Sequence, residues 1–269
     1  MICARALLLA LLVAAALQGT AAELKIAVFP SQSPDALGRY YHPTVELLRR
    51  KLDLPVQLLV ARDYDDVTQR LVGGAADVGF FGTASYVLAR MHHPGIRYLA
   101  TVMRPDDHYY CLVVVKQGSP VKSLADARGR SVGLTDKQST SGYLVPRRMF
   151  DRAGVNLDRD ARVFLLGRHH RVFDALAYGA IEVGAADSGA WNAAVKKHGE
   201  VFRVLARSAP IPRDPVAAAP HVDAALAARI QTILSDARAD PEFAREASEL
   251  KGYAVRSERF YDTIRKIIP

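Results

Sequence analysis

The segment Val67-Thr-Gln-Arg-Leu-Val-Gly-Gly-Ala-Ala-Asp-Val-Gly79 returns 105 residues later as Val172-Phe-Asp-Ala-Leu-Ala-Tyr-Gly-Ala-Ile-Glu-Val-Gly184. Val, Leu and Gly residues match at five positions of the two copies, and the acidic Asp77 corresponds to the acidic Glu182. Each copy has the pattern of an apolar helix face followed by glycine and a short strand. The repeat therefore predicts two similar α/β lobes of about 100 residues each.

Strand and helix patterns alternate around both copies. Short apolar runs predict strands at residues 24–29, 56–60 and 77–81, and a helix pattern begins near Pro43. Residues 130–135 form the comparable opening of the second half. Alternation of this kind indicates parallel sheets that are covered by helices.

Two proline-containing segments, residues 104–108 and 207–215, are the candidates for the junctions between the lobes. They imply that the chain leaves lobe one, builds lobe two and returns. The helical patterns from Val222 onward, which include residues 243–250, then pack on lobe one. The expected division is a lobe one of residues 23–107 plus 208–269 and a lobe two of residues 108–207. Two crossings leave a cleft, and ligands of open α/β sheets sit at the carboxyl ends of the strands.

The first 22 residues have the composition of a cleavable signal peptide. Arg5 precedes an almost wholly apolar run of about 12 residues, too short for the roughly 20 that cross a bilayer, and small residues follow it. We expect residues 1–22 to be removed on export to the periplasm. Cys111 is then the single cysteine left, so the core and not an internal disulfide has to hold the fold.

The composition excludes several classes of protein. Half of the 269 residues are hydrophobic and 24% are charged, which rules out a disordered chain and a coiled coil. The net charge of +8 is spread along the chain, which argues against a nucleic-acid surface and agrees with a diffuse field that attracts small anions. An ordinary solvated surface explains the same charge.

Ser139-Thr140-Ser141-Gly142 stands between a predicted strand and the helix that follows it. Hydroxyl donors beside the unpaired N–H groups of a helix start suit a tetrahedral oxyanion, and glycine allows the backbone to approach closely. Simple N-capping needs only one of these hydroxyls. The equivalent place in lobe one is Phe81-Gly82-Thr83, where Thr83 is available either as a helix cap or as a second contact with the anion.

His169 and His170 open the helix of the second copy. A neutral histidine at a helix N-terminus can donate one N–H to an anion. Metal binding is the rival interpretation, but the eight histidines are scattered, so we expect no metal and no cofactor. The sequence has no Gly-x-Ser-x-Gly, phosphate-loop or His-Glu-x-x-His motif, and we expect no enzyme. A hydrolase built from the scattered Ser139, His169 and Asp187 stays open as an alternative.

These residues resemble the periplasmic binding proteins of ABC importers for phosphonate, phosphite and phosphate-like anions. The similar segments reach across nearly the whole chain beyond residue 22, and they are Asp63-Tyr64, Asp77 to Tyr86, Ser139 to Pro146, His169 and Ile211 to Pro215. The resemblance implies the type II, Venus-flytrap fold, an α/β protein with two helix-covered sheets joined by two hinge crossings. It also implies that the ligand's oxygens are bound by Ser139, Thr140, Ser141 and His169, with contributions from Phe81, Gly82 and Thr83.

Three positions depart from the pattern of this family. Phe81 stands where aminoalkylphosphonate binders carry tyrosine. No carboxylate for a ligand amine stands at Ser188-Gly189, although Asp187 and Asp214 are close in sequence. Tyr110-Cys111 places a thiol where the family usually has serine. We expect Tyr110, Cys111, Asp187 and Asp214 to belong to the ligand site.

The resemblance implies a monomer that closes on a small oxyanion and presents it to an ABC permease in the inner membrane. The alternative is a periplasmic sensor that binds arsenite through Cys111 and signals to a membrane histidine kinase, as some relatives of the family do. Phosphite and methylphosphonate present similar oxygens, so the sequence does not separate them.

Overall fold

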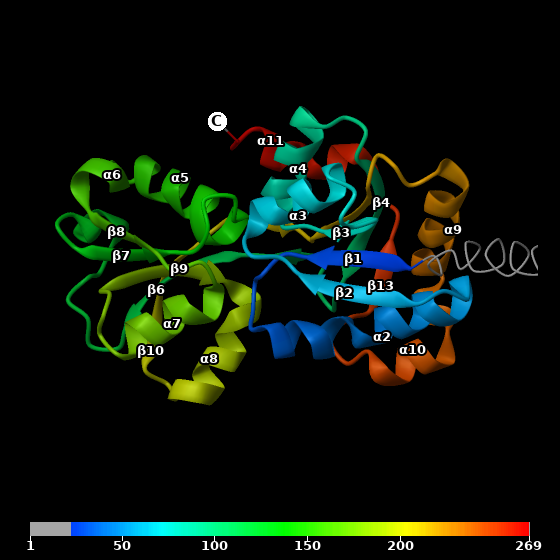
Figure 1. The fold of residues 1–269 in the computed structure, drawn as a ribbon. Coiled ribbons are helices and arrows are strands. Elements are labelled where there is room, and N and C mark those ends of the chain that lie inside the picture. Colours follow the sequence, from blue (N-terminus) through cyan, green and yellow to red (C-terminus); the bar gives the residue numbers. More distant parts are fainter. Residues whose placement is uncertain (1–22, 269) are drawn as a thin grey trace, which may run out of the picture.

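The computed structural model describes residues 23–268, which form two main sheets and a short ribbon between them (Figure 1). The first sheet has the strand order β13–β4–β12–β3–β1–β2. Its strands are β1 (Leu24–Val28), β2 (Val56–Val60), β3 (Val78–Phe80), β4 (Arg97–Met103), β12 (Pro215–Ala218) and β13 (Gly252–Ala254). The second sheet has the order β10–β6–β9–β7–β8. Its strands are β6 (Cys111–Lys116), β7 (Ser131–Leu134), β8 (Arg162–Leu165), β9 (Val183–Asp187) and β10 (Phe202–Arg207). The expected signal peptide, residues 1–22, lies outside the described residues.

Both sheets are built on the same plan. β1 pairs in parallel with β2 and β3, and β7 pairs in parallel with β8 and β9. Each sheet then adds an antiparallel strand, β12 beside β3 and β6 beside β9. The predicted α/β architecture with two similar sheets is therefore confirmed, but the expectation of parallel sheets is wrong in part, since both sheets are mixed.

The two crossings between the sheets lie against each other. β5 (His108–Tyr109) runs out of lobe one and pairs in antiparallel fashion with β11 (Ile211–Pro212), which runs back. β6 begins just after β5, and β12 begins just after β11. Each crossing is therefore followed directly by a strand of the sheet that the chain enters. We propose that the lobes divide at these crossings, with lobe two formed by residues 108–207.

Helices cover both faces of each sheet (Figure 1). Those of lobe one are α2 (Pro34–Leu52), α3 (Tyr64–Val72), α4 (Thr83–His92), α9 (Ala224–Ser235), α10 (Pro241–Glu246) and α11 (Asp262–Arg265). Those of lobe two are α5 (Val145–Arg152), α6 (Leu157–Asp160), α7 (His169–Ala177) and α8 (Trp191–His198), with a π-helical turn, η2 (Thr140–Leu144), ahead of α5. Within residues 23–268, none of the helices combines the length and the apolar character that a membrane crossing requires.

Two helix boundaries differ from the sequence prediction. α2 begins at Pro34 and not near Pro43, because Ser33 caps it by accepting the Ala36 N–H and a proline at the first helical position needs no hydrogen bond. The helix predicted over residues 243–250 ends at Glu246. The chain then turns into β13, which begins at Gly252 with a φ of 107°, a conformation that favours glycine.

The repeated glycines let a helix rest directly on a strand in each lobe. A Cβ on Gly79 would lie 3.0 Å from Val67 Cγ1 and 3.1 Å from Leu71 Cδ1. The same addition on Gly184 would lie 2.5 Å from Val172 Cγ1 and 2.8 Å from Leu176 Cδ1. The Val, Leu and Gly matches of the repeat thus form one packing unit, made twice by α3 on β3 and by α7 on β9.

The acidic residue of each repeat forms hydrogen bonds with the backbone of the first strand of its sheet. Asp77 Oδ2 accepts the Lys25 N–H of β1 at 2.7 Å, and Glu182 Oε2 accepts the Ser131 N–H of β7 at 3.0 Å. Each acidic residue also donates its own N–H to the same strand residue's carbonyl. The acidic position of the repeat is therefore structural in both lobes.

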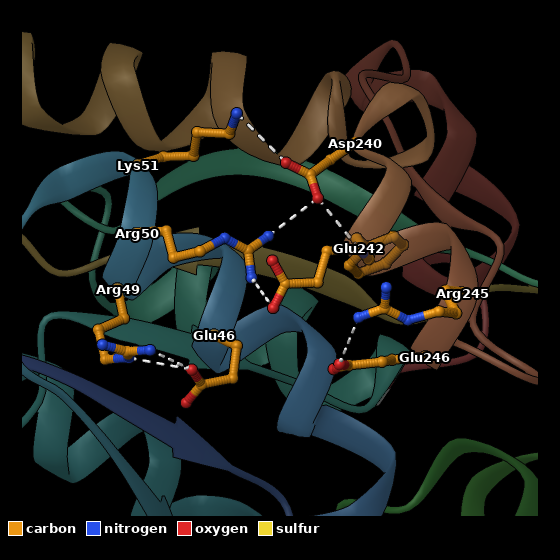
Figure 2. A network of polar contacts seen from close by, with 9 residues as sticks. Glu46, Arg49, Arg50, Lys51, Asp240, Glu242, Arg245 and Glu246 are labelled. Carbon is orange, nitrogen blue, oxygen red and sulfur yellow. Dashed lines mark hydrogen bonds and ion pairs between the residues drawn. The ribbon is translucent and has the colours of Figure 1, made fainter.

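The C-terminal segment packs on α2 of lobe one through a network of charged side chains (Figure 2). Arg50 pairs with Asp240 and Glu242 of the α10 region at 2.9 Å each, and Lys51 pairs with Asp240 at 3.2 Å. The same segments are also joined by a buried hydrogen bond of 2.5 Å between the hydroxyls of Thr44 and Tyr253. Surface ion pairs contribute little each, so the buried contacts carry most of this attachment.

Candidate functional site

A cavity of about 40 Å³ lies between the lobes, at the carboxyl ends of β1, β3, β7 and β9. One water needs about 10 to 15 Å³ by the same measure, so the cavity suits a molecule of a few heavy atoms. Its walls from lobe one and the crossings are Phe29, Ser31, Gln32, Leu37, Tyr40, Tyr41, Tyr64, Gly82, Arg104, Tyr109, Arg213 and Asp214. Its walls from lobe two are Ser139, Thr140, Ser141, His169, Asp187, Gly189 and Ala190.

The structure brings seven of the eleven predicted site residues to this cavity. They are Gly82, Ser139, Thr140, Ser141, His169, Asp187 and Asp214. Phe81, Thr83, Tyr110 and Cys111 do not line it.

The three hydroxyls of Ser139 to Ser141 have different roles. Ser139 caps η2, because its Oγ accepts the Gly142 N–H at 3.2 Å. Thr140 Oγ1 accepts the Ala84 N–H of lobe one at 2.8 Å. The Ser141 hydroxyl makes no hydrogen bond within the described part of the chain. A hydroxyl that accepts an N–H keeps its own O–H for donation. The Ser139 hydroxyl also interacts with Tyr64 and the Thr140 hydroxyl with Tyr109, so Ser141 is the hydroxyl of the three without a partner among the described residues.

Gly142 is required by packing against the preceding loop. A Cβ at this position would lie 2.6 Å from Thr135 Cγ2, and even closer to the Thr135 hydroxyl. The Thr135 N–H in turn donates to the Gly142 carbonyl at 3.0 Å. The glycine therefore fixes the turn that presents the serines.

His169 is held as a neutral donor. Its Nδ1 accepts the Asp187 backbone N–H at 3.1 Å, which leaves the ring proton on Nε2. Nε2 lies 3.4 Å from the Tyr64 hydroxyl of lobe one. Burial lowers the pKa of His169, with Asp187 opposing this shift, so the ring is uncharged at neutral pH. His169 can thus donate one N–H into the cavity.

Two carboxylates and two guanidinium groups share the cavity wall. Burial, with repulsion from Asp187, raises the pKa of Asp214 to about 7, against the opposing effect of Arg213 and Arg104. Burial would lower the pKa of Arg104, but Tyr40, Asp187 and Asp214 outweigh it, so this pKa lies above its ordinary value. Arg104 is therefore a permanent cation, whereas Asp214 exchanges its proton near neutral pH.

The aromatic part of the wall was missed by sequence reasoning. Tyr40, Tyr41, Tyr64 and Tyr109 all line the cavity, and burial raises the pKa of each, so all four keep their hydroxyl protons. The adjacent Tyr40 and Tyr41 in α2 were the available signal. Arg104 and Arg213, in the two proline-containing crossings, were also missed.

The four predicted residues outside the cavity have structural contacts. Phe81 packs its ring against Tyr86 at a centroid distance of 5.9 Å, and Thr83 donates to the Pro212 carbonyl at 2.9 Å. Thr83 does not cap α4, whose N-cap is Gly82. Tyr110 points away from the cavity, under the Arg207 guanidinium, because alternation along an extended chain places its neighbour Tyr109 there instead.

Cys111 is fully buried in β6, opposite Asp187 of β9. Burial, together with the charge of Asp187, raises the pKa of its thiol. Thiolate, not thiol, is the form that binds soft metals and metalloids, so this environment does not favour an arsenite site. Within residues 23–268, no three His, Cys, Asp or Glu side chains are grouped as metal ligands.

Three hydrogen bonds close the cleft around the cavity. The Ala84 N–H donates to Thr140 Oγ1, and the Tyr64 hydroxyl forms a hydrogen bond with His169 Nε2. Gln138 Nε2 donates to Asp65 Oδ1 at 2.9 Å. Tyr64 and His169 are the first residues of α3 and α7, so they occupy equivalent positions of the repeat. The two lobes therefore touch in this structure, and their helix starts face each other.

A family model described as ABC transporter, phosphonate, periplasmic substrate-binding protein matches residues 26–256. The phosphate-import protein PhnD of Mycolicibacterium smegmatis is 28% identical over 148 residues, which make up 51% of this chain and 46% of that protein. The probable ABC transporter phosphite binding protein PhnD1 of Prochlorococcus marinus is 24% identical over 183 residues, 65% of this chain and 61% of its own length. The matched part of this chain thus spans less than two thirds of either relative.

Solved structures agree in fold. A binding protein component of an ABC phosphonate transporter from Pseudomonas aeruginosa has a TM-score of 0.84 at 17% identity, over 92% of this chain and 85% of that one. PhnD1 of Prochlorococcus marinus in complex with methylphosphonate has a TM-score of 0.82 at 18% identity, over 91% and 96% of the two chains. Because the family model extends over most of the sequence, this chain belongs to the family of phosphonate periplasmic substrate-binding proteins of ABC transporters.

Proposed function

We propose that this protein binds a small phosphorus oxyanion, a phosphonate, phosphite or phosphate, in the interlobe cavity and delivers it to an ABC importer. The observation that carries the proposal is that neutral donors from both lobes line one small cavity: Ser139, Ser141 and His169 from lobe two and Tyr64 from lobe one. The names of the relatives, which refer to phosphate, phosphite and phosphonates, support the same ligand class.

Neutral donors suit an anion that has to be released again. Each hydroxyl or imidazole N–H contributes a directed hydrogen bond without adding a full charge to the cavity. A protonated Asp214 adds one more donor, because its pKa of about 7 leaves part of the population uncharged at neutral pH. Gly82 leaves room for the ligand at the start of α4, where Tyr64 already lies 3.0 Å from the position of a Cβ.

Closure of the lobes is the step that the ligand drives. A ligand that contacts Tyr64 and His169 together binds the closed form better than the open form, so binding shifts the population toward closure. The Thr140 to Ala84 hydrogen bond adds to the closed state without using the ligand. The closed form would then dock on the permease, with the protein acting as a monomer that reaches the periplasm through a signal peptide at residues 1–22.

Thermal unfolding of the exported protein with a panel of anions tests the proposal. The panel is phosphate, phosphite, methylphosphonate, sulfate and arsenite. A ligand at 1,000 times its Kd stabilises by about 4 kcal/mol, or roughly 8 to 16 °C at this size. We expect such a shift with at least one phosphorus oxyanion, and its loss in Ser141→Ala.

Two results would contradict the proposal. A shift with none of the phosphorus oxyanions would remove it, and a shift with arsenite alone would transfer the function to Cys111 and a sensor. Recovery of the bound anion unchanged, followed by ³¹P NMR after prolonged incubation, separates binding from hydrolysis.

A further inference from the structure

The cavity carries acceptors as well as donors. Asp187 comes from the end of β9 in lobe two, and Asp214 comes from the return crossing in lobe one. A wall with oxyanion donors and carboxylates suits, by composition, two ligand classes: a plain oxyanion, or a zwitterion that carries an ammonium group as well. The choice between them depends on whether the carboxylates already have a cation from the chain itself.

Arg104 supplies such a cation from lobe one. Its Nε donates to the Tyr40 hydroxyl at 3.1 Å, and its guanidinium carbon lies 4.7 Å from the centre of the Tyr40 ring. These two contacts hold the guanidinium at the cavity wall, where the side chain is only 19% exposed. Arginine carries its charge at every relevant pH, so this cation is always present.

Gly189 brings Arg104 close to the carboxylate of lobe two. A Cβ on Gly189 would lie 2.8 Å from Asp187 Oδ1 and 3.8 Å from Arg104 Nη1. Both charged groups therefore lie within 4 Å of one point beside Gly189, whose N–H donates to Asp187 Oδ1. Arg104 also interacts electrostatically with Asp214, so it serves both carboxylates.

Arg213 completes the balance of charges. It lines the same cavity, donates from Nε to the Asp106 carbonyl at 3.0 Å, and interacts electrostatically with Asp214. Two guanidinium groups thus face two carboxylates, one of which is partly protonated at neutral pH. An additional ammonium group would meet two fixed cations and no unbalanced carboxylate.

We infer that Arg104 is a specificity-determining residue. Its guanidinium already neutralises the carboxylates that a ligand ammonium group would need as partners. The protein therefore binds phosphorus oxyanions that lack an amino group and rejects aminoalkylphosphonates. This inference rests on the proposed function, because it names the ligand class of the same cavity.

Two ligands of nearly equal size test the inference. Ethylphosphonate and aminomethylphosphonate differ by a methyl group in place of an ammonium group, so their ratio of Kd values measures charge and not volume. Titration calorimetry with the exported protein should give wild type at least about tenfold preference for ethylphosphonate, the size of effect measured for close charge pairs. Arg104→Gln should lower that preference about tenfold or more, and Arg104→Lys, which keeps a cation, should retain most of it.

Two further variants separate charge from other effects of the substitution. Glu249→Gln removes the exposed partner of Arg104, whose Oε2 lies 3.3 Å from Nη1, and should leave the preference unchanged. The double variant Arg104→Gln/Asp214→Asn should lose the aminomethylphosphonate binding that Arg104→Gln gains, because the carboxylate that attracts the ammonium is gone.

The outcomes distinguish this inference from the proposed function. Wild type that binds methylphosphonate and takes both test ligands equally well overturns the inference alone, and this result needs no variant to fold. A parallel rise in affinity for both test ligands in Arg104→Gln means that arginine excludes by size, which also overturns it. Wild type that binds no phosphorus oxyanion removes the proposed function and the inference together.

Discussion

The two lobes place a serine cap after their first strand, and they use it differently. In lobe one, Ser33 follows β1, accepts the Ala36 N–H at 3.4 Å and is exposed to solvent. In lobe two, Ser139 follows β7, accepts the Gly142 N–H at 3.2 Å and is only 1% exposed, in the cavity wall. One local motif is therefore a plain helix cap in one lobe and part of the candidate site in the other. The scaffold is repeated, but the loops after the strands are not.

The first residues of α3 and α7 extend this comparison. Tyr64 and His169 are equivalent in the repeat, and both reach the cavity from opposite sides. Lobe one offers a large ring with a weakly acidic hydroxyl, whereas lobe two offers an imidazole whose tautomer is set by the Asp187 backbone. The closed site is thus asymmetric although its frame is nearly symmetric.

The largest expected effect concerns the two carboxylates, Asp214 of lobe one and Asp187 of lobe two. The pKa of Asp214 is about 7 in the folded protein and 3.8 without the fold. Between these values the folded protein holds a proton that the unfolded chain has lost, so the free energy of unfolding falls as the pH rises from about 4 to about 7. The loss amounts to at most about 4 kcal/mol.

Urea unfolding of the ligand-free protein at pH 4.5 and pH 8 measures this effect. Asp214→Asn should flatten the pH dependence and be more stable than wild type at pH 8. Asp187→Asn should end the fall at a lower pH and make it smaller, because removal of the neighbouring charge lowers the pKa of Asp214. A wild-type profile identical to that of Asp214→Asn would show that Asp214 titrates normally.

The repeated glycines give the next largest effect. Gly184→Ala should destabilise by about 1 to 3 kcal/mol, since its Cβ would meet Val172 and Leu176 at distances that require a backbone shift. Gly79→Ala should cost a similar amount, because its Cβ would lie 2.6 Å from Phe81 Cε2 as well as 3.0 Å from Val67 and 3.1 Å from Leu71. Urea titration of both variants checks this expectation, and Gly118→Ser, at an open turn with a φ of 74°, serves as the control for conformational strain alone. Equal stability of Gly184→Ala and wild type would contradict the shared packing unit.

Removing the His169 side chain should weaken anion binding more than removing the hydroxyl of its counterpart Tyr64. His169→Ala removes a donor that the fold has fixed in one tautomer, and an unpaired ligand oxygen costs about 1 to 3 kcal/mol, or roughly fivefold to 150-fold in Kd. Tyr64→Phe should cost less, because rotation of the hydroxyl makes it a less directed donor. Calorimetry with the anion that gives the largest thermal shift compares the two, and His169→Gln, which keeps an N–H donor, should recover part of the loss. A larger loss in Tyr64→Phe than in His169→Ala would reverse the asymmetry.

The sequence predicted the fold because the repeat is a local signal. Each copy contains a helical period, a glycine and a strand within 13 residues. The residues that pack together therefore lie close in sequence, and the pattern can be recognised without the rest of the chain. The start of α2 was missed because Pro30 to Pro34 has loop composition, although proline at the first turn after Ser33 also suits a helix start. Boundaries of this kind depend on one cap and not on a period.

The site residues that were predicted are also those with a local sequence signal, and those that were missed depend on distant contacts. Ser139 to Ser141 and His169 were predicted because each stands at a helix start that the sequence marks. Arg104 was missed because its role depends on Tyr40, 64 residues earlier in the chain, and on Asp187, far along in the other lobe. Tyr110 was chosen where Tyr109 lies in the wall, since the side of an extended chain that faces a cavity changes with each residue.

Substitution of the two serine caps, Ser33 and Ser139, should have the smallest effect on stability, and it compares the two lobes directly. Ser33→Ala and Ser139→Ala should each lose about 1 kcal/mol of stability, because both remove the acceptor of a helix N–H. Only Ser139→Ala should also weaken anion binding, by about tenfold, since its hydroxyl alone lies in the cavity wall. Urea unfolding and calorimetry on the same two variants separate the shared capping role from the binding role. A loss of affinity in Ser33→Ala as large as that in Ser139→Ala would mean that the cap acts through the stability of its lobe and not through contact with the ligand.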